Sequence, residues 1–332
     1  MEEVITLDYG SGGEKTSELI SSVLLPEFQN PALEALGDGA VLAGGEKLVF
    51  SSDSFVVSPW KFPGGDIGKL CVCGTVNDLC MSGGIPKYLS LSLILEEGFP
   101  MESLKEILRS AARTARETGV LVVTGDTKVV ERGKGDGIYI NTAGIGILRA
   151  PGLGKENLRE GDAVIVSGSI GCHGAAVMME RAGLAESSGL QSDCRALNEL
   201  CGAALEAGTV RVMRDPTRGG AATVLNEFVE GTSLGVELDE KAVPVEEAVE
   251  AACGLLGLDV FYCACEGRMI LAAPQEDSAG IVEALRKLPG GEGASCIGKI
   301  TGQYPGQVVL KTRLGGKRLL TKLSGSQLPR IC

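Results

Sequence analysis

The sequence predicts an α/β (α+β) protein built from two mixed domains. Strand-like and helix-like segments alternate along 332 residues, and a break containing glycine and proline falls at 150–154. Glycine is abundant at 48 residues and aromatics make up only 4%, which indicates many tight turns. The length suits two domains of ordinary size. We expect domains at 1–150 and 155–322, followed by a mobile tail over 323–332.

In the first half, hydrophobic periodicity predicts each element. Serine and leucine alternate over 88–95, as in a strand with one buried face, and Pro100 and Gly119 mark the ends of an amphipathic helix. Polar residues on one face of several strands favour a sheet that helices cover on one side. The expected strands are 48–57, 88–95, 120–124 and 138–147, and the expected helices are 67–81 and 101–117.

The second half begins after the break with a strongly apolar strand at 163–166. Further strands are expected near 234–238, 268–273, 296–301 and 307–311. Helices are expected near 173–182, 194–207, 219–230, 246–256 and 278–288. These elements interleave, which predicts a second α/β or α+β domain.

Composition excludes several classes of function. With 31 Lys and Arg against 43 Asp and Glu, the net charge is −12, which argues against nucleic-acid and anionic-membrane partners. The start has no signal-peptide pattern and no apolar run is long enough to cross a bilayer, so we expect a cytoplasmic protein. Eleven cysteines indicate free thiols, and the single histidine, His173, argues against His-based zinc sites.

The glycine-rich segment 10–16 resembles a phosphate-binding loop at first sight. A Walker A loop has glycine immediately before its lysine, where Glu14 stands here, so the segment is not that loop. Gly12, Gly13 and Lys15 can still offer backbone N–H groups and a cation to phosphates. A mobile N-terminal turn is the alternative interpretation.

Five aspartates lie in small-residue turns or near strand ends: Asp38, Asp53, Asp78, Asp126 and Asp215. Mg²⁺ bound to nucleotide phosphates uses a few carboxylates plus water. Asp78 stands on an otherwise apolar helix, where an unpaired charge is costly. Each aspartate alone is more commonly a turn or cap residue. The set together predicts a metal–phosphate site.

Several other charged residues could serve such a site. Arg218 opens a predicted helix, whose N-terminus favours anions, and Lys128 and Arg132 follow Asp126 closely. We expect these cations to meet phosphate. Glu266 precedes the predicted strand at 268–273 and is either a general base or a surface turn residue.

The chain ends on Cys332, after a soft stretch at 323–327. A thiol on a flexible tail is a mobile nucleophile, although with 11 cysteines the position can also be accidental. The adjacent α-carboxylate opposes ionisation of the thiol, so activation must come from a partner's site or from the electrophile. Arg330 either offsets that charge or serves surface solubility.

Eight segments, in this order, resemble the ATP-binding superfamily of aminoimidazole ribonucleotide synthetase and selenophosphate synthetase. They are 10–13, 52–55, 62–70, 73–78, 95–98, 123–130, 215–220 and 329–332. The aspartate segments indicate the superfamily. The Pro-Arg-Ile-Cys ending is similar to that of its HypE family, the carbamoyl dehydratases of hydrogenase maturation. The resemblance covers nearly the whole chain.

This resemblance implies N-terminal domains that pair into a homodimer through a β-barrel, with ATP and Mg²⁺ in a groove between the two domains. It implies that Cys332 accepts a carbamoyl group from the carbamoyltransferase HypF. ATP-dependent dehydration would then convert the adduct to a thiocyanate. The cyanide would pass to iron on a HypC–HypD complex, for the active site of a [NiFe]-hydrogenase.

The resemblance also implies residue roles. Cys332 would carry the substrate, Glu266 would take the nitrogen proton and Lys128 would neutralise phosphate charge, while the five aspartates would hold Mg²⁺. The nucleotide would be bound by Gly12, Gly13, Lys15, Asp53, Thr75, Asn77, Asp78, Asp126, Thr127 and Arg218. Two positions depart from the pattern. Cys265 precedes Glu266 where the family has Asn, and Gly39 stands where the superfamily often has a second acid, so Asp38 is the least secure ligand.

Two other functions compete with this interpretation. A phosphotransferase resembling selenophosphate synthetase would need a cysteine or selenocysteine in segment 8–15, which has none. A non-catalytic maturation scaffold would present the tail to partners but would have no use for the aspartates.

Overall fold

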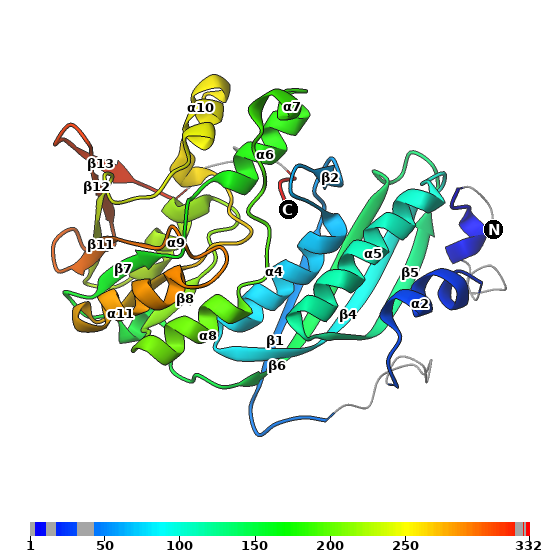
Figure 1. Cartoon of the computed structure of the whole chain (residues 1–332), viewed down its shortest axis with the longest axis horizontal. Coiled ribbons are helices and arrows are strands. Elements are labelled where there is room, and N and C mark those ends of the chain that lie inside the picture. The colour runs from blue at the N-terminus through cyan, green and yellow to red at the C-terminus, as the bar shows by residue number, and fades with distance from the viewer. Residues whose placement is uncertain (1–3, 11–17, 32–42, 323–327, 329) are drawn as a thin grey trace.

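The computed structural model describes residues 4–10, 18–31, 43–322, 328 and 330–332. Two sheets, one in each half of the chain, form the framework, and helices pack against both (Figure 1). A two-stranded ribbon of β2 (Lys61–Phe62) and β3 (Gly65–Asp66) belongs to the first half of the chain. The α/β character that the sequence predicts is confirmed.

The first sheet has four strands in the order β1-β6-β4-β5. Neighbouring strands are antiparallel except β4 and β5, which are parallel and joined through helix α5. A parallel pair needs such a crossover, because a short turn cannot return the chain to the same end of the sheet. The bounds are β1 (Leu48–Phe55), β4 (Gly84–Glu96), β5 (Leu121–Val130), β6 (Ile138–Leu148), α4 (Ile67–Met81) and α5 (Met101–Thr118).

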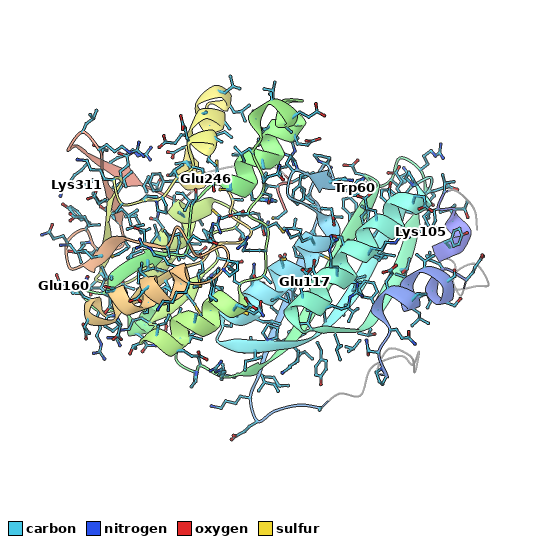
Figure 2. All side chains as sticks on the ribbon, viewed as in Figure 1. Trp60, Lys105, Glu117, Glu160, Glu246 and Lys311 are labelled. Atoms are coloured by element: carbon cyan, nitrogen blue, oxygen red, sulfur yellow. The ribbon has the colours of Figure 1, made fainter. Side chains whose placement is uncertain are left out.

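Local sequence explains both helices of this half. The Asp66 carboxylate caps α4 by accepting hydrogen bonds from the backbone N–H groups of Gly68 and Lys69, at 2.7 and 3.0 Å. A Cβ at Gly68 would lie 2.1 Å from the carbonyl oxygen of Ile107, so glycine lets α4 and α5 approach closely. Gly119 ends α5 in the left-handed conformation, with φ of 72°. Charged side chains such as Lys105 and Glu117 project from the outer surface of α5 (Figure 2).

Among the described residues, helices cover one face of this sheet, as the sequence predicts. Thr142 of β6 faces α4 and shares a hydrogen bond with Thr75. The opposite face carries polar residues such as Ser54 and Asn141, joined by a 3.0 Å hydrogen bond. It also carries exposed apolar side chains: Leu48, Phe50, Ile94 and Leu121. We call this the open face of the first sheet.

The second sheet has seven strands in the order β13-β12-β9-β11-β7-β10-β8, antiparallel throughout except for the β12–β9 pair. The strands are β7 (Ala163–Val166), β8 (Val212–Arg214), β9 (Gly235–Asp239), β10 (Ile270–Ala273), β11 (Ser295–Thr301), β12 (Val308–Lys311) and β13 (Lys317–Leu320). The helices are α6 (Cys172–Arg181), α7 (Ala185–Ser188), α8 (Asn198–Ala207), α9 (Gly220–Val229), α10 (Glu247–Leu256) and α11 (Gln275–Arg286).

Both faces of the second sheet are buried. On β7, Ile165 packs into the core that includes α8 and α11, whereas Val164 and Val166 pack into the core that includes α9. Neighbouring residues of a strand point to opposite faces, which is why this strand is apolar without interruption. Short elements complete the chain: η1 (Leu7–Gly10), η2 (Ile20–Leu24), α2 (Leu25–Phe28), η3 (Lys155–Asn157) and η4 (Val260–Tyr262).

The two halves are joined at α4. The fully buried Asn77 donates to the carbonyl oxygen of Arg195 at 3.1 Å and accepts from the N–H of Leu197 at 2.8 Å. Apolar residues of α4, such as Val76 and Cys80, share one core with Leu197. The halves therefore meet through a packed interface, which we call the seam.

Several sequence predictions differ from the structure. The predicted strand 120–124 continues to Val130, because its extension pairs with β4, so Asp126 lies inside a strand rather than after it. The predicted helix 194–207 begins only at Asn198, because residues before it extend along the seam. β8 and β13 were not predicted. The described strands form no closed barrel, and in the part of the chain that is described no helix is long and apolar enough to cross a membrane.

Asn77→Ala should destabilise the protein by about 2 kcal/mol, because it leaves a buried backbone N–H and C=O without their partner. Urea denaturation measures the effect. Asn157→Ala is the matched control, since Asn157 is exposed and donates to the carbonyl oxygen of Gly152 at 2.7 Å. Equal unfolding midpoints for the two variants would show that Asn77 does not hold the seam.

Candidate functional site

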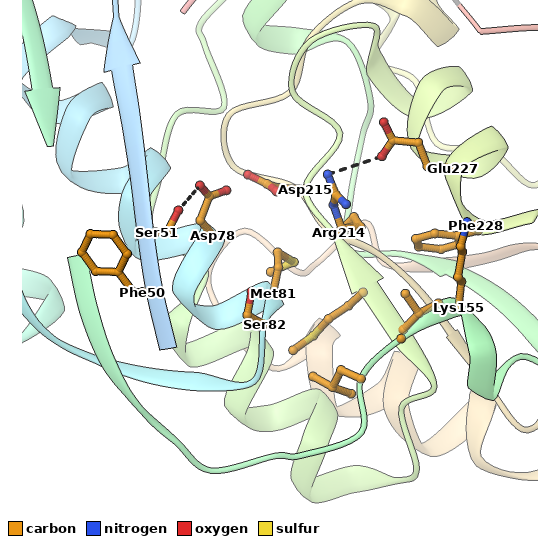
Figure 3. Close-up of a pocket in the computed structure, with 14 residues that line it drawn as sticks. Phe50, Ser51, Asp78, Met81, Ser82, Lys155, Arg214, Asp215, Glu227 and Phe228 are labelled. Atoms are coloured by element: carbon orange, nitrogen blue, oxygen red, sulfur yellow. Dashed lines mark hydrogen bonds and ion pairs between the residues drawn. The ribbon is translucent and has the colours of Figure 1, made fainter. Parts of the chain in front are cut away.

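A cavity of about 460 Å³ opens at the seam (Figure 3). Asp78 and Asp215 point toward each other across it, one from α4 and the other from the loop after β8. Ser51 of β1 donates a 2.7 Å hydrogen bond to Asp78, and Arg214 pairs with Glu227 at 3.3 Å. The lining residues are Phe50, Ser51, Asp78, Met81, Ser82, Leu153, Gly154, Lys155, Val212, Met213, Arg214, Asp215, Glu227 and Phe228.

Three of the predicted aspartates lie close together here: Asp78 and Asp215 line the cavity, and Asp53 interacts electrostatically with both. Asp53 lies on the α4-facing side of β1, since it is paired with Thr142 and its carboxylate comes within 3.7 Å of a Cβ built on Gly74. Burial raises the pKa of Asp53 and the pKa of Asp78, and the charge of Asp78 raises that of Asp53 further. For Asp78, the hydrogen bond from Ser51 acts in the opposite direction.

Asp215 is the most strongly perturbed of the three. It is buried in the loop between β8 and α9, and burial is the main reason that its pKa rises to about 7. The negative charges of Asp78 and Asp53 add to the shift, whereas Arg214 opposes it. Burial disfavours the charged form of Asp215, and the charge of Arg214 offsets only part of this effect. The cluster therefore suits a cation brought in from outside.

Glu266 is held beside this cluster by backbone hydrogen bonds. Its N–H donates to the carboxylate of Asp193 at 3.0 Å, and its carbonyl oxygen accepts from Arg195 N–H at 3.2 Å. The side chain is 2% exposed, and its Oε1 has no hydrogen-bond partner among the described residues. Burial, then the charges of Cys194 and Asp215, raise the pKa of Glu266 well above its usual value.

The terminal Cys332 is docked at the same place, and the C-terminus lies beside the β2 ribbon in Figure 1. The N–H of Val56 donates to the carbonyl oxygen of Cys332 at 3.0 Å. Burial raises the pKa of the thiol to about 12. Among charges, Glu266 has the largest effect on this pKa, and Arg218 opposes it. Burial, rather than the neighbouring α-carboxylate, is thus the main obstacle to ionisation.

Arg218 stands just before α9, as the sequence predicts. The turn requires glycine, because Gly219 and Gly220 have φ of 77° and 58°, and a Cβ on Gly220 would lie 2.6 Å from the carbonyl oxygen of Phe261. Arg218 is exposed, and its charge lowers the pKa of both Asp53 and Cys332. It is therefore a cation within reach of the carboxylates and the thiol.

Other predicted residues do not join the cluster within one chain. Asp126 is paired with Ser92 on the open face of the first sheet, so it lies on the opposite side of the sheet from Asp53. Lys128 forms a 2.6 Å ion pair with Asp126, which lowers the pKa of that carboxyl, and Thr127 donates to the same carboxylate through its N–H at 2.9 Å. The strand register is the physical reason for this separation.

Two further predicted nucleotide ligands lie in the interior of the protein. Thr75 and Asn77 are both fully buried and make hydrogen bonds within the protein, so neither lines the cavity. Packing against β6 and the seam encloses both residues, and their contact with a nucleotide stays a prediction. Four other expected residues, Gly12, Gly13, Lys15 and Asp38, lie outside the described residues.

Sequence reasoning also missed functional neighbours. Ser51 lies two residues before Asp53 on the same strand face, a spacing that could have identified it. Arg214 directly precedes Asp215 and could have been noticed as a cavity cation. No local signal marks Asp193, whose role depends on a contact with Glu266, 73 residues away.

Comparison with known proteins places these observations in a family. Residues 36–148 match the family model of the AIR synthase related protein, N-terminal domain, and residues 159–311 match that of the C-terminal domain. The chain is 42% identical to the carbamoyl dehydratase HypE of Rhodobacter capsulatus over 337 residues, which covers 100% of this chain and 99% of the relative.

Two solved structures are similar in fold and sequence. A hydrogenase maturation protein HypE in complex with ATP is 46% identical, with a TM-score of 0.95 over 98% of this chain and 99% of the other. A chain of a HypE–HypF complex is 40% identical, with a TM-score of 0.79 over 92% of this chain and 99% of the other. The full-length identity, the two matched domains and the carboxylate-lined seam show that this chain belongs to the HypE family of carbamoyl dehydratases.

Proposed function

We propose that this protein dehydrates a carbamoyl group carried on its own Cys332 to a thiocyanate, at the expense of ATP, and thereby supplies cyanide for hydrogenase maturation. The observation that carries the proposal is the docked thiol beside Glu266 and the seam carboxylates. The HypE family membership and the ATP complex of a 46% identical relative support it.

The chemistry follows from the leaving group. A carbamoyl oxygen leaves poorly, but transfer of the γ-phosphoryl group from ATP to that oxygen turns it into phosphate. The N–H protons depart, the C–O bond breaks, and the carbon–nitrogen bond becomes a nitrile on sulfur. The products are the thiocyanate, ADP and phosphate, so the water removed from the carbamoyl group ends in the phosphate.

Glu266 is our proposed base for the nitrogen proton. Its burial beside Cys332 places it near the adduct, and its raised pKa makes the ionised form a stronger base than an exposed glutamate. Once the carbamoyl group is attached to Cys332, its dehydration does not require an ionised thiol. The raised pKa of the docked Cys332 therefore hinders acceptance of the carbamoyl group but not its dehydration.

We propose that ATP and Mg²⁺ bind at the seam. Burial raises the pKa values of Asp53, Asp78 and Asp215, and the charges of neighbouring carboxylates add to the shifts of Asp53 and Asp215, so a bound cation would stabilise the ionised forms of all three. Among the described residues, no three Asp, Glu, Cys or His side chains converge closely enough to hold an ion by themselves. This fits Mg²⁺, which takes one or two carboxylates together with phosphate oxygens and water, and which neutralises charge on the transferred phosphoryl group.

Four further residues remain proposed nucleotide ligands: Arg218, Asp126, Thr127 and Lys128. They differ in whether one chain alone can bring them to the nucleotide. Arg218 can reach phosphate within one chain. Asp126 and Lys128 lie on the open face of the first sheet, where the exposed Ile94 is paired with Lys128, whereas Thr127 is paired with the buried Leu93, so its side chain points to the other face. We propose that a second copy covers this face, forming the dimeric β-barrel and bringing these residues to a shared site. Gly12, Gly13, Lys15 and Asp38 stay predictions.

The partners are proposed from the family. HypF is favoured because a 40% identical relative forms part of a HypE–HypF complex. A HypC–HypD complex as the acceptor, and a cytoplasmic location, stay predictions from the sequence. A scaffold without catalysis is disfavoured by the perturbed carboxylates, since presenting a tail needs no buried cation site.

Cys332→Ala should abolish both carbamoylation and the ATP-dependent loss of one water from the modified chain, because it removes the carrier sulfur. Intact-mass spectrometry after incubation with HypF, carbamoyl phosphate and ATP measures both steps. Cys296→Ala, which removes an exposed thiol, is the control and should behave as wild type. Conversion that persists in Cys332→Ala would reject the proposal.

Glu266→Gln should accept the carbamoyl group normally but dehydrate it at least about 100-fold more slowly. In the wild type, the rate should increase with pH, because the raised pKa delays formation of the basic carboxylate. Single-turnover quenched-flow kinetics measures this rate. Glu276→Gln, at an exposed position on α11, serves as control. A normal rate in Glu266→Gln would exclude Glu266 as the base.

Binding of Mg²⁺ with a non-hydrolysable ATP analogue should weaken as the pH falls below about 7, up to about tenfold per pH unit. The sign follows from Asp215: its pKa is raised to about 7, so below that value a proton occupies the carboxylate and competes with the metal. Isothermal titration calorimetry at several pH values measures the affinity. Asp215→Asn should bind more weakly with a flatter profile, and an identical profile in both proteins would exclude Asp215 as a ligand.

A further inference from the structure

We infer that helix α6 is the receptor for the C-terminal tail, in which His173 and Arg181 hold the last two peptide carbonyls before Cys332 and so position the sulfur for dehydration. The inference rests on the proposed role of Cys332 as carrier. Its subject is a pair of positioning residues, since both side chains act on the tail through its backbone carbonyls.

The tail forms a short antiparallel pairing with the segment that follows β1. The N–H of Val56 donates to the carbonyl oxygen of Cys332 at 3.0 Å, and that of Ser58 to the carbonyl oxygen of Arg330 at 3.3 Å. In return, the Nε of Arg330 donates to the carbonyl oxygen of Val56 at 3.0 Å. Because β1 also carries Asp53, this pairing aligns the end of the tail with the seam.

The imidazole of His173 adds a further hydrogen bond to the tail. It is fully buried, and its Nε2 lies 2.8 Å from the carbonyl oxygen of Ile331. A carbonyl oxygen can only accept, so Nε2 must carry a proton. Burial lowers the pKa of His173 to about 4, so the ring is neutral and Nδ1 must accept from the Ser192 hydroxyl, 2.8 Å away. The Cys194 N–H donates to Ser192 Oγ at 3.0 Å, which sets the direction of this chain.

Arg181, at the other end of α6, bridges the tail and the segment after β1 with which the tail pairs. Its Nη2 donates to the carbonyl oxygen of Arg330, and its Nε donates to the carbonyl oxygen of Ser58 at 2.6 Å. One planar guanidinium therefore holds both sides of the pairing. Arg330 adds an ion pair with Asp136 and lies over the ring of Tyr139.

The loop that contains Ser192 and Asp193 contacts both the tail receptor and Glu266, the proposed base. Ser192 orients His173, and the next residue, Asp193, accepts from the N–H of Glu266. A displacement of this loop would move both anchors together. The receptor thus couples the position of the sulfur to that of Glu266, while its contacts to the tail combine reversible hydrogen bonds with the packing of two apolar side chains, Leu328 and Ile331. Reversibility is required, because the tail must leave to collect the carbamoyl group.

Iodoacetamide labelling of the unmodified, ATP-free protein tests the receptor, with peptide mass spectrometry as the readout. The docked thiol is partly buried and its pKa is raised to about 12, so Cys332 should label slowly relative to the exposed Cys296 in the same chain. Arg181→Ala and Ser192→Ala should increase the Cys332-to-Cys296 labelling ratio at least about tenfold. Arg149→Ala, which removes an exposed arginine paired with Glu206, is the matched control and should leave the ratio unchanged.

A second readout links docking to the reaction. When the chain is already carbamoylated, Arg181→Ala and Ser192→Ala should dehydrate it more slowly, whereas the carbamoylation rate should be unchanged or higher. Unchanged labelling ratios in both variants, with wild-type dehydration, would overturn the inference. Labelling requires neither ATP nor a carbamoyl donor, so it reports on the receptor even if Cys332→Ala disproves the carrier role.

Discussion

The burial of several carboxyl groups at the seam is the constraint on which the rest of this structure depends. Asp53 and Asp78 come from the first half, whereas Asp215 and Glu266 come from the second, and packing of the halves removes water from all four. Nearby arginines offset only part of the negative charge. Like charges in a low dielectric repel strongly, so a bound cation would stabilise the ionised carboxylates of this cluster.

Because of the same burial, the terminal thiol differs in reactivity between a docked and a released state of the tail. A docked Cys332 is a poor nucleophile, because desolvation and the charge of Glu266 disfavour its thiolate. A released tail escapes both effects and regains ordinary thiol reactivity. On the proposed route, acceptance of the carbamoyl group belongs to the released state and dehydration to the docked one. The polar contacts of His173 and Arg181 suit a tail that alternates between the two.

Much of the fold could be predicted because its signals are local. Helix 67–81 has the predicted bounds, since the Asp66 cap and the run of small apolar residues define it without distant contacts. The predictions failed where pairing or packing decided the outcome. Residues after 124 continue as strand because β4 pairs with them, and the loop before Asn198 is extended because the seam holds it. Neither β4 nor the seam can be recognised from the residues that neighbour these segments along the chain.

By itself, the sequence determined the residue types at the site and the Pro-Arg-Ile-Cys ending, because motifs and caps depend on neighbours along the chain. Only the tertiary structure decided which aspartates meet. Asp53 and Asp126 both stand on strands of one sheet, yet register directs them to opposite faces. It also decided that the amide of Asn77 joins the halves and that Cys332 rests beside Glu266. Register, burial and the pKa shifts that burial causes arise from contacts between distant segments.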